Sequence, residues 1–261
     1  MRSPLSRCRI PGSLAPWATI VAFAALAPPA YSIPPLVSGD VATASKGSRE
    51  LFVGHVQSES GGTTSREDPF LELVYGLTEH QELTIETPLV FYDDSTRTEG
   101  GFGDVVVGTK YRLHGLPAAD SGLSASLEVK LPTGDRDRGL GSGATDVDLR
   151  FRFGRQFHRE VIYGNLGHTW MGESMGEQLE NRWFASGVWD HPVGSTVRLL
   201  TEVYARTSSD PAGPNRLAAT TGIKWRVFPG QQCHLSVGRS IRAHAEGGPR
   251  LRIYAGWRWD F

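Results

Sequence analysis

Charged side chains recur at every second position along several stretches of this sequence. Lys110 and Arg112 are two residues apart, as are Glu128 and Lys130. Residues two apart in a β-strand point to the same face, so each pair would place its charges side by side. Such a face could select charged solutes, or its acids and bases could pair across neighbouring strands. We expect cross-strand ion pairs for most of these residues.

Motifs that would indicate an enzyme give little support. HExxH and CxxC are absent, and the glycine-rich runs 101–103 and 139–143 lead into alternating segments. A phosphate-binding loop needs a helix behind it. The run from Asp135 to Arg138 could bind a divalent cation or phosphates, but a solvated loop tip needs no ligand. His168 could serve a lipid-hydrolysing barrel, but no serine partner can be assigned to it. We expect no enzyme, no cofactor and no metal site.

The elements that would hold the charged residues are strands. Apolar and polar residues alternate through nearly the whole chain after residue 48, and a period of two indicates a half-buried strand. Most segments are about 9 to 13 residues long, which suits a tilted strand that crosses a bilayer. We predict an all-β fold, an antiparallel up-and-down transmembrane β-barrel of about 12 strands. The segments span 49–58, 69–77, 81–92, 102–113, 122–132, 144–154, 160–170, 179–189, 195–206, 216–227, 231–243 and 249–261.

In this register the charged residues share one face, which would line the lumen. A charge facing lipid costs about 2–4 kcal/mol near the bilayer midplane, so this segregation itself indicates a membrane. The predicted lumen residues are Asp104, Lys110, Arg112, Glu128, Lys130, Asp146, Asp148, Arg150, Arg152, Arg198, Glu202, Lys224, Arg226, Arg252 and Arg258. The same face also carries Glu72, Glu82, Glu86, Arg242 and Asp260.

Aromatic residues recur near the end of every second segment, on the opposite face. Their spacing of 34 to 42 residues corresponds to one hairpin pair. Aromatic side chains at one level of a barrel form an interfacial girdle, whereas a soluble β-sandwich would scatter them along its strands. The predicted girdle comprises Tyr75, Tyr111, Phe153, Trp189, Trp225, Trp259 and Phe261.

The composition alone would suggest a soluble protein. The 261 residues carry a net charge of −1, with 39% hydrophobic and 21% charged residues. No run approaches the roughly 20 apolar residues of a membrane-spanning helix, and the near-neutral charge gives no reason to expect nucleic acid. Alternation explains the averages, because each strand divides its residues between lipid and lumen.

The first 32 residues have the layout of a secretory signal peptide. Three arginines precede the apolar run 18–27, and Ala30-Tyr31-Ser32 provides a cleavage site after Ser32. Removal of these residues would change the net charge from −1 to −4 and leave Cys233 as the one cysteine, so no intramolecular disulfide could form. Residues 33–48 lack alternation and are predicted to be a periplasmic tether. The barrel would occupy residues 49–261.

The connections predict the orientation of the barrel. Short turns face the periplasm and longer loops face outside, which puts both mature termini in the periplasm. We therefore expect an outer-membrane location, with lipid and lipopolysaccharide as surroundings. The C-terminal Phe261 resembles the signal that the barrel-assembly machinery recognises.

Five segments together resemble one bacterial family. GFGDVVVGTKYRL at 101–113, SLEVKLPTGD at 126–135, GSGATDVDL at 141–149, NLGHTW at 165–170 and LLTEVY at 199–204 follow in that order. They resemble the putative MetA-pathway of phenol degradation proteins over about residues 50–261. The resemblance implies an outer-membrane barrel that passes hydrophobic or aromatic compounds. Asp104, Lys130, Asp146 and Glu202 match its motif positions, without an assigned role.

We predict a passive channel for small hydrophobic or aromatic solutes. The alternatives are a structural or adhesive barrel with a plugged lumen and, third, a lipid-modifying barrel enzyme. A 12-stranded barrel is intermediate between side-chain-filled and water-filled barrels. The register is ambiguous in the first, seventh, eighth and eleventh segments. In the eleventh, Arg239 falls on the lipid side, which suggests a bulge.

Overall fold

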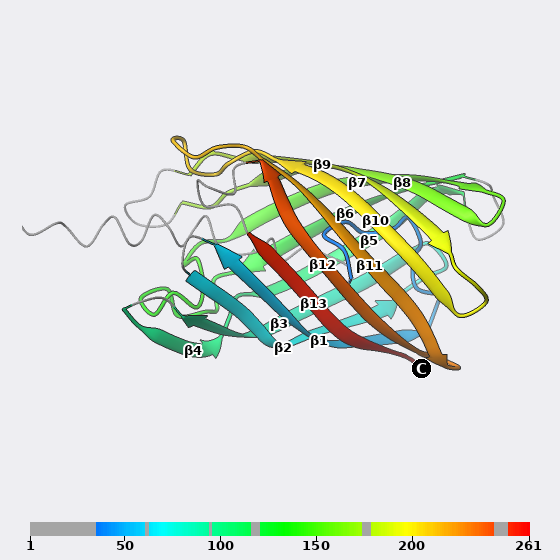
Figure 1. Ribbon diagram of the computed structural model, residues 1–261, viewed down its shortest axis with the longest axis horizontal. Helices are drawn as coiled ribbons and strands as arrows, with labels where there is room; N and C mark the ends of the chain where they lie inside the picture. Colours follow the sequence, from blue (N-terminus) through cyan, green and yellow to red (C-terminus); the bar gives the residue numbers. More distant parts are fainter. Residues whose placement is uncertain (1–34, 61–62, 94–95, 116–120, 174–178, 243–249) are drawn as a thin grey trace, which may run out of the picture.

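A single antiparallel β-sheet closes on itself in the computed structural model (Figure 1). The structure describes residues 35–60, 63–93, 96–115, 121–173, 179–242 and 250–261, so the expected signal peptide lies outside them. Among these residues no helix is long and apolar enough to cross a membrane. The strands are β1 (Arg49–Ser60), β2 (Thr63–Gly76), β3 (Gln81–Asp93), β4 (Thr98–Phe102), β5 (Val105–Gly115), β6 (Ser121–Leu131), β7 (Asp146–Phe157), β8 (Glu160–Trp170), β9 (Arg182–Pro192), β10 (Val197–Arg206), β11 (Arg216–Phe228), β12 (Gln231–Arg242) and β13 (Leu251–Asp260).

The ring has twelve positions because β4 and β5 share one of them. β3 pairs with β5 from Gln81 to Glu86 and with β4 from Leu89 to Asp93. Gly103 and Asp104 separate the two strands. Pairing of β1 with β13 closes the ring. The predicted all-β barrel of about 12 strands is therefore confirmed, and the fourth predicted segment is interrupted near its start.

The two ends of the barrel differ in their connections. At the end that we call the turn end, residues 77–80, 158–159, 193–196 and 229–230 link successive strands. The opposite end, the loop end, carries longer connections such as 132–145 and 207–215. Both Arg49, where β1 begins, and the C-terminal Phe261 lie at the turn end, where their backbones hydrogen-bond to each other at 2.9 Å.

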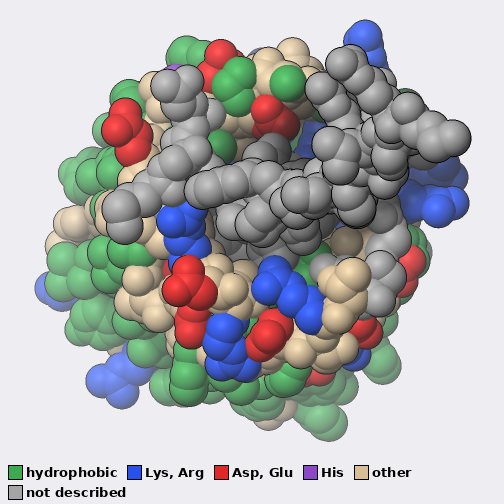
Figure 2. Space-filling view, turned by 90° about the vertical axis from the view of Figure 1, so that its left-hand side faces the viewer, with side chains coloured by type: hydrophobic (Ala, Val, Ile, Leu, Met, Phe, Trp, Pro, Cys, Tyr) green, Lys and Arg blue, Asp and Glu red, His purple; other side chains and the backbone are tan. Residues whose placement is uncertain are grey.

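Side chains alternate between a wall exposed to the surroundings and a buried lumen. Leu127 is 46% exposed, whereas its neighbour Ser126 is 3% exposed. Figure 2 views the loop end, where hydrophobic side chains gather on the outer wall and charged ones stand together in the lower half of the mouth. Near the turn end, the predicted girdle residues Tyr75, Tyr111, Phe153, Trp189, Trp225 and Phe261 are 37% to 63% exposed, and Trp259 is partly exposed.

Residues 35–48, named here the inner segment, enter the lumen. They were predicted to be a periplasmic tether, yet Leu36 and Val37 are 1% and 2% exposed. Leu36 packs against Tyr163, Val188 and Leu200. Burial of an aliphatic side chain contributes about 1.5–3 kcal/mol, so a stretch without alternation is held by inward apolar residues of the wall.

These contacts also explain the ambiguous segments. In β8 and β9 apolar residues occur on both faces, because Tyr163 and Val188 face the inner segment while Ile162 and Trp189 face outward. In β1, Phe52 is buried inward against Ala44 and Val74. The lumen of this barrel thus has an apolar part.

Arg239 lies on the outward side of β12 without a bulge beside it. Its neighbours Gly238 and Ser240 are buried, while Arg239 is exposed. The register shift lies beyond it, between the pairs Ala218–Ser240 and Leu217–Arg242. The predicted irregularity is therefore present at the loop end of this strand, but it does not turn Arg239 inward.

Candidate functional site

The carboxylate of Glu202 attaches the inner segment to the wall. Glu202 lies on β10 and is completely buried. Its Oε2 accepts a hydrogen bond from the Val37 backbone N–H at 3.0 Å, and its Oε1 accepts one from the Ser38 hydroxyl. On β12, the Ser236 hydroxyl donates to the Pro35 carbonyl at 2.5 Å. Since hydrogen bonds to charged groups contribute about 1.5–3 kcal/mol each, Glu202 is a principal anchor.

A second attachment lies nearer the turn end. The Ala44 N–H donates to Glu82 Oε2 at 2.6 Å, and Glu82 Oε1 lies 2.9 Å from Lys110 Nζ. Gly76 approaches the inner segment so closely that a Cβ there would lie 1.9 Å from the Ser45 carbonyl oxygen. Glycine is therefore required at this crossing.

Asp40 brings a carboxylate into the lumen. Its Oδ2 lies 3.8 Å from Lys224 Nζ, and its Oδ1 accepts a hydrogen bond from the Ala42 N–H. Burial acts to raise the pKa of Asp40, but attraction by Lys224, Lys110, Arg258 and Arg152 outweighs it and lowers the pKa below its ordinary value. The inner segment therefore carries a negative charge toward a largely cationic part of the lumen.

Most predicted lumen residues form ion pairs, chiefly between neighbouring strands, although Arg150 and Asp148 share β7 and Lys224 pairs with the inner segment. Asp148 and Arg150 are 0% and 2% exposed, and such buried charges require partners. Arg112 and Arg226 instead donate to the backbone carbonyls of Glu79 and Ser195. The ion pairs include Lys110–Glu82, Lys130–Asp146, Arg150–Asp148, Arg152–Glu128, Arg198–Asp190, Lys224–Asp40 and Arg258–Glu50. Arg252 is also buried, at 8% exposed.

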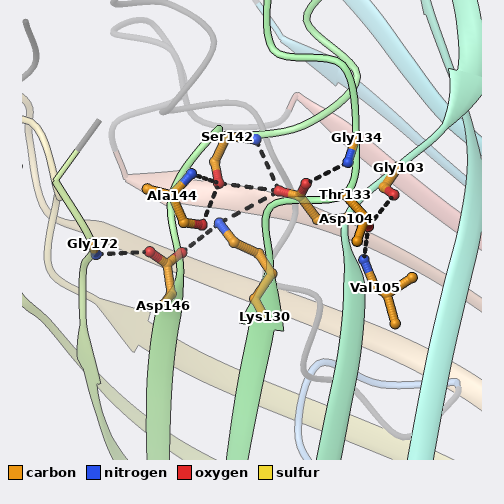
Figure 3. A network of polar contacts seen from close by, with 10 residues as sticks. All are labelled: Gly103, Asp104, Val105, Lys130, Thr133, Gly134, Ser142, Ala144, Asp146 and Gly172. Atoms are coloured by element: carbon orange, nitrogen blue, oxygen red, sulfur yellow. Dashed lines mark hydrogen bonds and ion pairs between the residues drawn. The ribbon is translucent and has the colours of Figure 1, made fainter. Parts of the chain in front are cut away.

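At the loop end, Asp104 and Asp146 form a network around Lys130 (Figure 3). Lys130 Nζ lies 2.5 Å from Asp146 Oδ2 and 3.8 Å from Asp104 Oδ2. Asp104 also accepts hydrogen bonds from the N–H groups of Gly134 and Ser142, at 2.9 and 2.8 Å. Asp104, at the interruption between β4 and β5, therefore accepts hydrogen bonds that stabilise the fold of the connection 132–145.

Thr133 completes this network at the interruption. Its hydroxyl accepts a hydrogen bond from the Val105 N–H at 2.8 Å and donates to the Gly103 carbonyl at 3.1 Å. The side chain thus replaces backbone pairing where the strand is broken. Thr133 and Gly134 of the motif that spans 131–146 therefore stabilise the fold of this connection.

Residues of the charged run 135–138 make contacts within the connection 132–145 and with β4. Arg138 Nε lies 2.9 Å from Glu99 Oε2, and its Nη2 donates to the Gly100 carbonyl. Arg138 also donates its backbone N–H to Asp135 Oδ1 at 3.2 Å. These contacts hold the connection against β4.

His168 lies among aromatic side chains on the outer wall. Its ring centroid is 4.7 Å from that of Trp170 and 4.4 Å from that of Trp183. A G-x-S-x-G spacing at 172–176, which sequence reasoning missed, follows β8 in a loop-end connection, and its residues from 174 onward lie outside the described part. Within the described residues, no group of three or more His, Cys, Asp or Glu side chains could hold a metal ion.

Sequence reasoning missed the acids and backbone groups that complete the lumen. Asp190, which pairs with Arg198 at 2.6 Å, follows the predicted end of its segment by one residue. Asp40, Val37 and Ser38 lie in a stretch predicted to be outside the barrel. The runs Leu36-Val37 and Val41-Ala42 were the available signal, because apolar residues are unusual in a free tether.

Comparisons with known proteins agree with this architecture. The family described as "Putative MetA-pathway of phenol degradation" matches residues 40–250. Comparison with curated sequences found no match. The COG4313 outer membrane channel from Pseudomonas putida F1 has 17% identity and a TM-score of 0.71, with 88% of this chain and 100% of that chain covered.

Two further solved structures have the same kind of fold. The KdgM porin in complex with disordered oligogalacturonate has 9% identity and a TM-score of 0.58, with 81% of this chain and 99% of that one covered. The NanC porin has 9% identity and a TM-score of 0.58, with 80% and 98% covered. At these identities the similarity establishes the barrel fold.

Proposed function

Because the chain belongs to the family described as "Putative MetA-pathway of phenol degradation", we propose that it is an outer-membrane channel for passive passage of small hydrophobic or aromatic solutes. The observation that carries this proposal is the closed barrel with an apolar outer wall and a charged lumen. The family description supports an aromatic solute. Passage needs neither a cofactor nor covalent chemistry.

The proposed orientation places the turn end in the periplasm. Short turns face the periplasm in barrels of this type, so the inner segment would enter the lumen from that side. The outer wall would contact lipid and, toward the loop end, lipopolysaccharide. The last strand, β13, would present Phe261 to the barrel-assembly machinery. Residues 1–32 would act as the signal peptide that exports the chain.

The inner segment favours one alternative, a structural barrel with a plugged lumen. Leu36, Val37 and Ser38 are at most 2% exposed, so they fill part of the cross-section. A channel requires a path beside this segment or its displacement. The two functions make different predictions for conductance.

Conductance in a planar bilayer tests the proposal. The refolded protein, verified by heat-modifiable migration on a detergent gel, is expected to give discrete current steps. A fully inserted protein that stays silent would favour the plugged barrel. Hydrolysis of labelled phospholipid that is lost in His168→Ala would instead support an enzyme.

A further inference from the structure

A pocket opens on the lumen side at the turn end, next to the contact between Lys224 and Asp40 of the inner segment. It has a volume of about 480 Å³, within the range of roughly 300–1,000 Å³ that suits small ligands. The turns after β7 and β9 contribute His158, Arg159 and residues 194–196. The strands β10, β11 and β12 contribute inward residues, among them Gln232.

The charge of this pocket is one-sided. Arg159, Arg198, Lys224 and Arg226 line it together with His158. No Asp or Glu side chain is among the described residues that line it. Asp190 and Asp40 lie behind Arg198 and Lys224, but the cations that face the same space still repel one another, and an anion between them would relieve this repulsion.

Backbone carbonyls hold two of the arginines without neutralising them. Arg226 Nη2 donates to the Ser195 carbonyl at 2.6 Å, and Arg159 Nη2 donates to the Gly194 carbonyl at 3.2 Å. Both carbonyls belong to the turn 193–196, so these hydrogen bonds orient the two exposed guanidinium groups, which keep their charge. Preorganised donors of this kind lower the cost of binding an anion.

Arg198 has donor capacity left over. Its Nε lies 2.6 Å from Asp190 Oδ1, but its buried Nη2 has no hydrogen-bond partner among the described residues. A buried donor without a partner costs free energy. The Arg198 side chain as a whole is 36% exposed, so a small rotation of the guanidinium group would bring this donor to a ligand oxygen.

Lys224 is paired with an acid of the inner segment. Its side chain is 17% exposed, and Asp40 Oδ2 lies 3.8 Å away, beyond the length of a strong charge-assisted hydrogen bond. Asp40 thus brings a carboxylate to the edge of the pocket without entering the lining. Asp40 partly neutralises the charge of Lys224, as a bound carboxylate would.

We infer that this pocket binds a small organic carboxylate and that Asp40 competes with the ligand for Lys224. The inference rests on the proposed function, since it gives the charge of the solute that the channel would pass. Arg198 and Arg226 would bind the carboxylate oxygens as rigid forks, and Lys224 would contribute a point charge. Ligand binding would weaken one attachment of the inner segment.

Ligand-observed saturation-transfer NMR with benzoate tests the inference on refolded, detergent-solubilised full-length protein. Benzamide has the same ring and no charge, so it serves as the matched ligand. We expect benzoate to bind roughly tenfold more tightly than benzamide at low ionic strength, where charges are least screened. Arg198→Gln with Lys224→Gln should reduce benzoate affinity by about tenfold or more and leave benzamide unchanged. Asp40→Asn should increase benzoate affinity.

The control variant is Arg49→Gln, which removes an exposed cation at the same end of the barrel, outside the pocket lining. Every variant is first checked by heat-modifiable gel migration, so that loss of the fold is not read as loss of binding. Equal affinities for benzoate and benzamide would overturn the inference, as would benzoate binding that survives the double substitution. Binding does not require conduction: a silent barrel that binds benzoate refutes the channel alone, and a conducting barrel that does not bind it refutes the pocket alone.

Discussion

Replacing Glu202 by glutamine should loosen the inner segment while leaving the barrel wall paired. The carboxylate accepts hydrogen bonds from the Val37 N–H and the Ser38 hydroxyl, one at each oxygen. Glutamine keeps a single oxygen, so one donor would face the amide NH₂ group. A hydrogen bond to a charged group contributes about 1.5–3 kcal/mol and a neutral one about 0.5–1.5 kcal/mol.

Loss of one charged acceptor and weakening of the other amounts to on the order of 3 kcal/mol. This corresponds to a roughly hundredfold increase in the undocked population. The burial of Leu36 and Val37 is retained, so the segment should remain docked for most of the time. Single-channel recording should therefore show brief openings of higher conductance, more frequent in Glu202→Gln than in the unmodified protein.

Cysteine labelling gives a second readout of the same displacement. Ala44→Cys, in a Cys233→Ser background, places a thiol on a residue that is 6% exposed in the docked segment. Glu202→Gln should accelerate its reaction with a membrane-impermeant maleimide, and Glu79→Gln, an exposed turn residue, should not. If both conductance and labelling rate stay unchanged in Glu202→Gln, Glu202 does not anchor the inner segment.

Three further predictions concern the loop end and pH. Asp104→Ala removes the acceptor of the Gly134 and Ser142 N–H groups and should lower the free energy of unfolding by about 2–4 kcal/mol. The measurement is the temperature at which half of the protein changes its migration on the detergent gel. An equal effect of Asp137→Ala, at an exposed loop tip, would argue against the network. Lys130→Met leaves the buried Asp146, 2% exposed, without its cation. It should lower the free energy of unfolding, measured by urea denaturation, by about 3–5 kcal/mol, and Lys130→Arg should lower it less. Equal losses in the two variants would show that the charge is irrelevant. Lys224 and other cationic neighbours lower the pKa of Asp40 against the effect of burial. The ionised Asp40 therefore stabilises the docked inner segment fully above the ordinary pKa of 3.8, and this stabilisation is lost as the pH falls through the lower pKa of Asp40 in the folded protein. Exposure of Ala44→Cys in acid can be followed with a pyridyl disulfide, which still reacts with thiols there. The part of this exposure that Asp40→Asn removes should appear only below that ordinary value, and a difference between the two variants near neutral pH would contradict this assignment.

Alternation was sufficient to predict the wall, because each strand must satisfy lipid and lumen with successive residues. It failed wherever the lumen itself is apolar. Tyr163 and Val188 blurred the pattern of their strands because Leu36 covers them, and that partner lies more than a hundred residues away in the sequence. A period of two reports on the local face and carries no information about a distant segment.

The interruption at Gly103 and Asp104 was hidden for a related reason. Asp104 fits the inward face of an uninterrupted strand, so its position in the alternation was correct while its role was not visible. Its partners lie in a connection about thirty residues downstream. The ion pairs could be expected from neighbouring strands, but not the partner of Lys224, which is supplied by the inner segment.

The route of the inner segment has a consequence for how the ring is completed. It touches β3 through Glu82, β10 through Glu202 and β12 through Ser236, and it continues directly into β1. The seam between β1 and β13 is the last junction that an up-and-down order of strand addition would form. Closure of that seam therefore has to follow entry of the segment, or the segment would need to thread into a finished cylinder. Because the inner segment contacts three separate strands of the wall, it can keep the incomplete barrel curved until β1 and β13 pair.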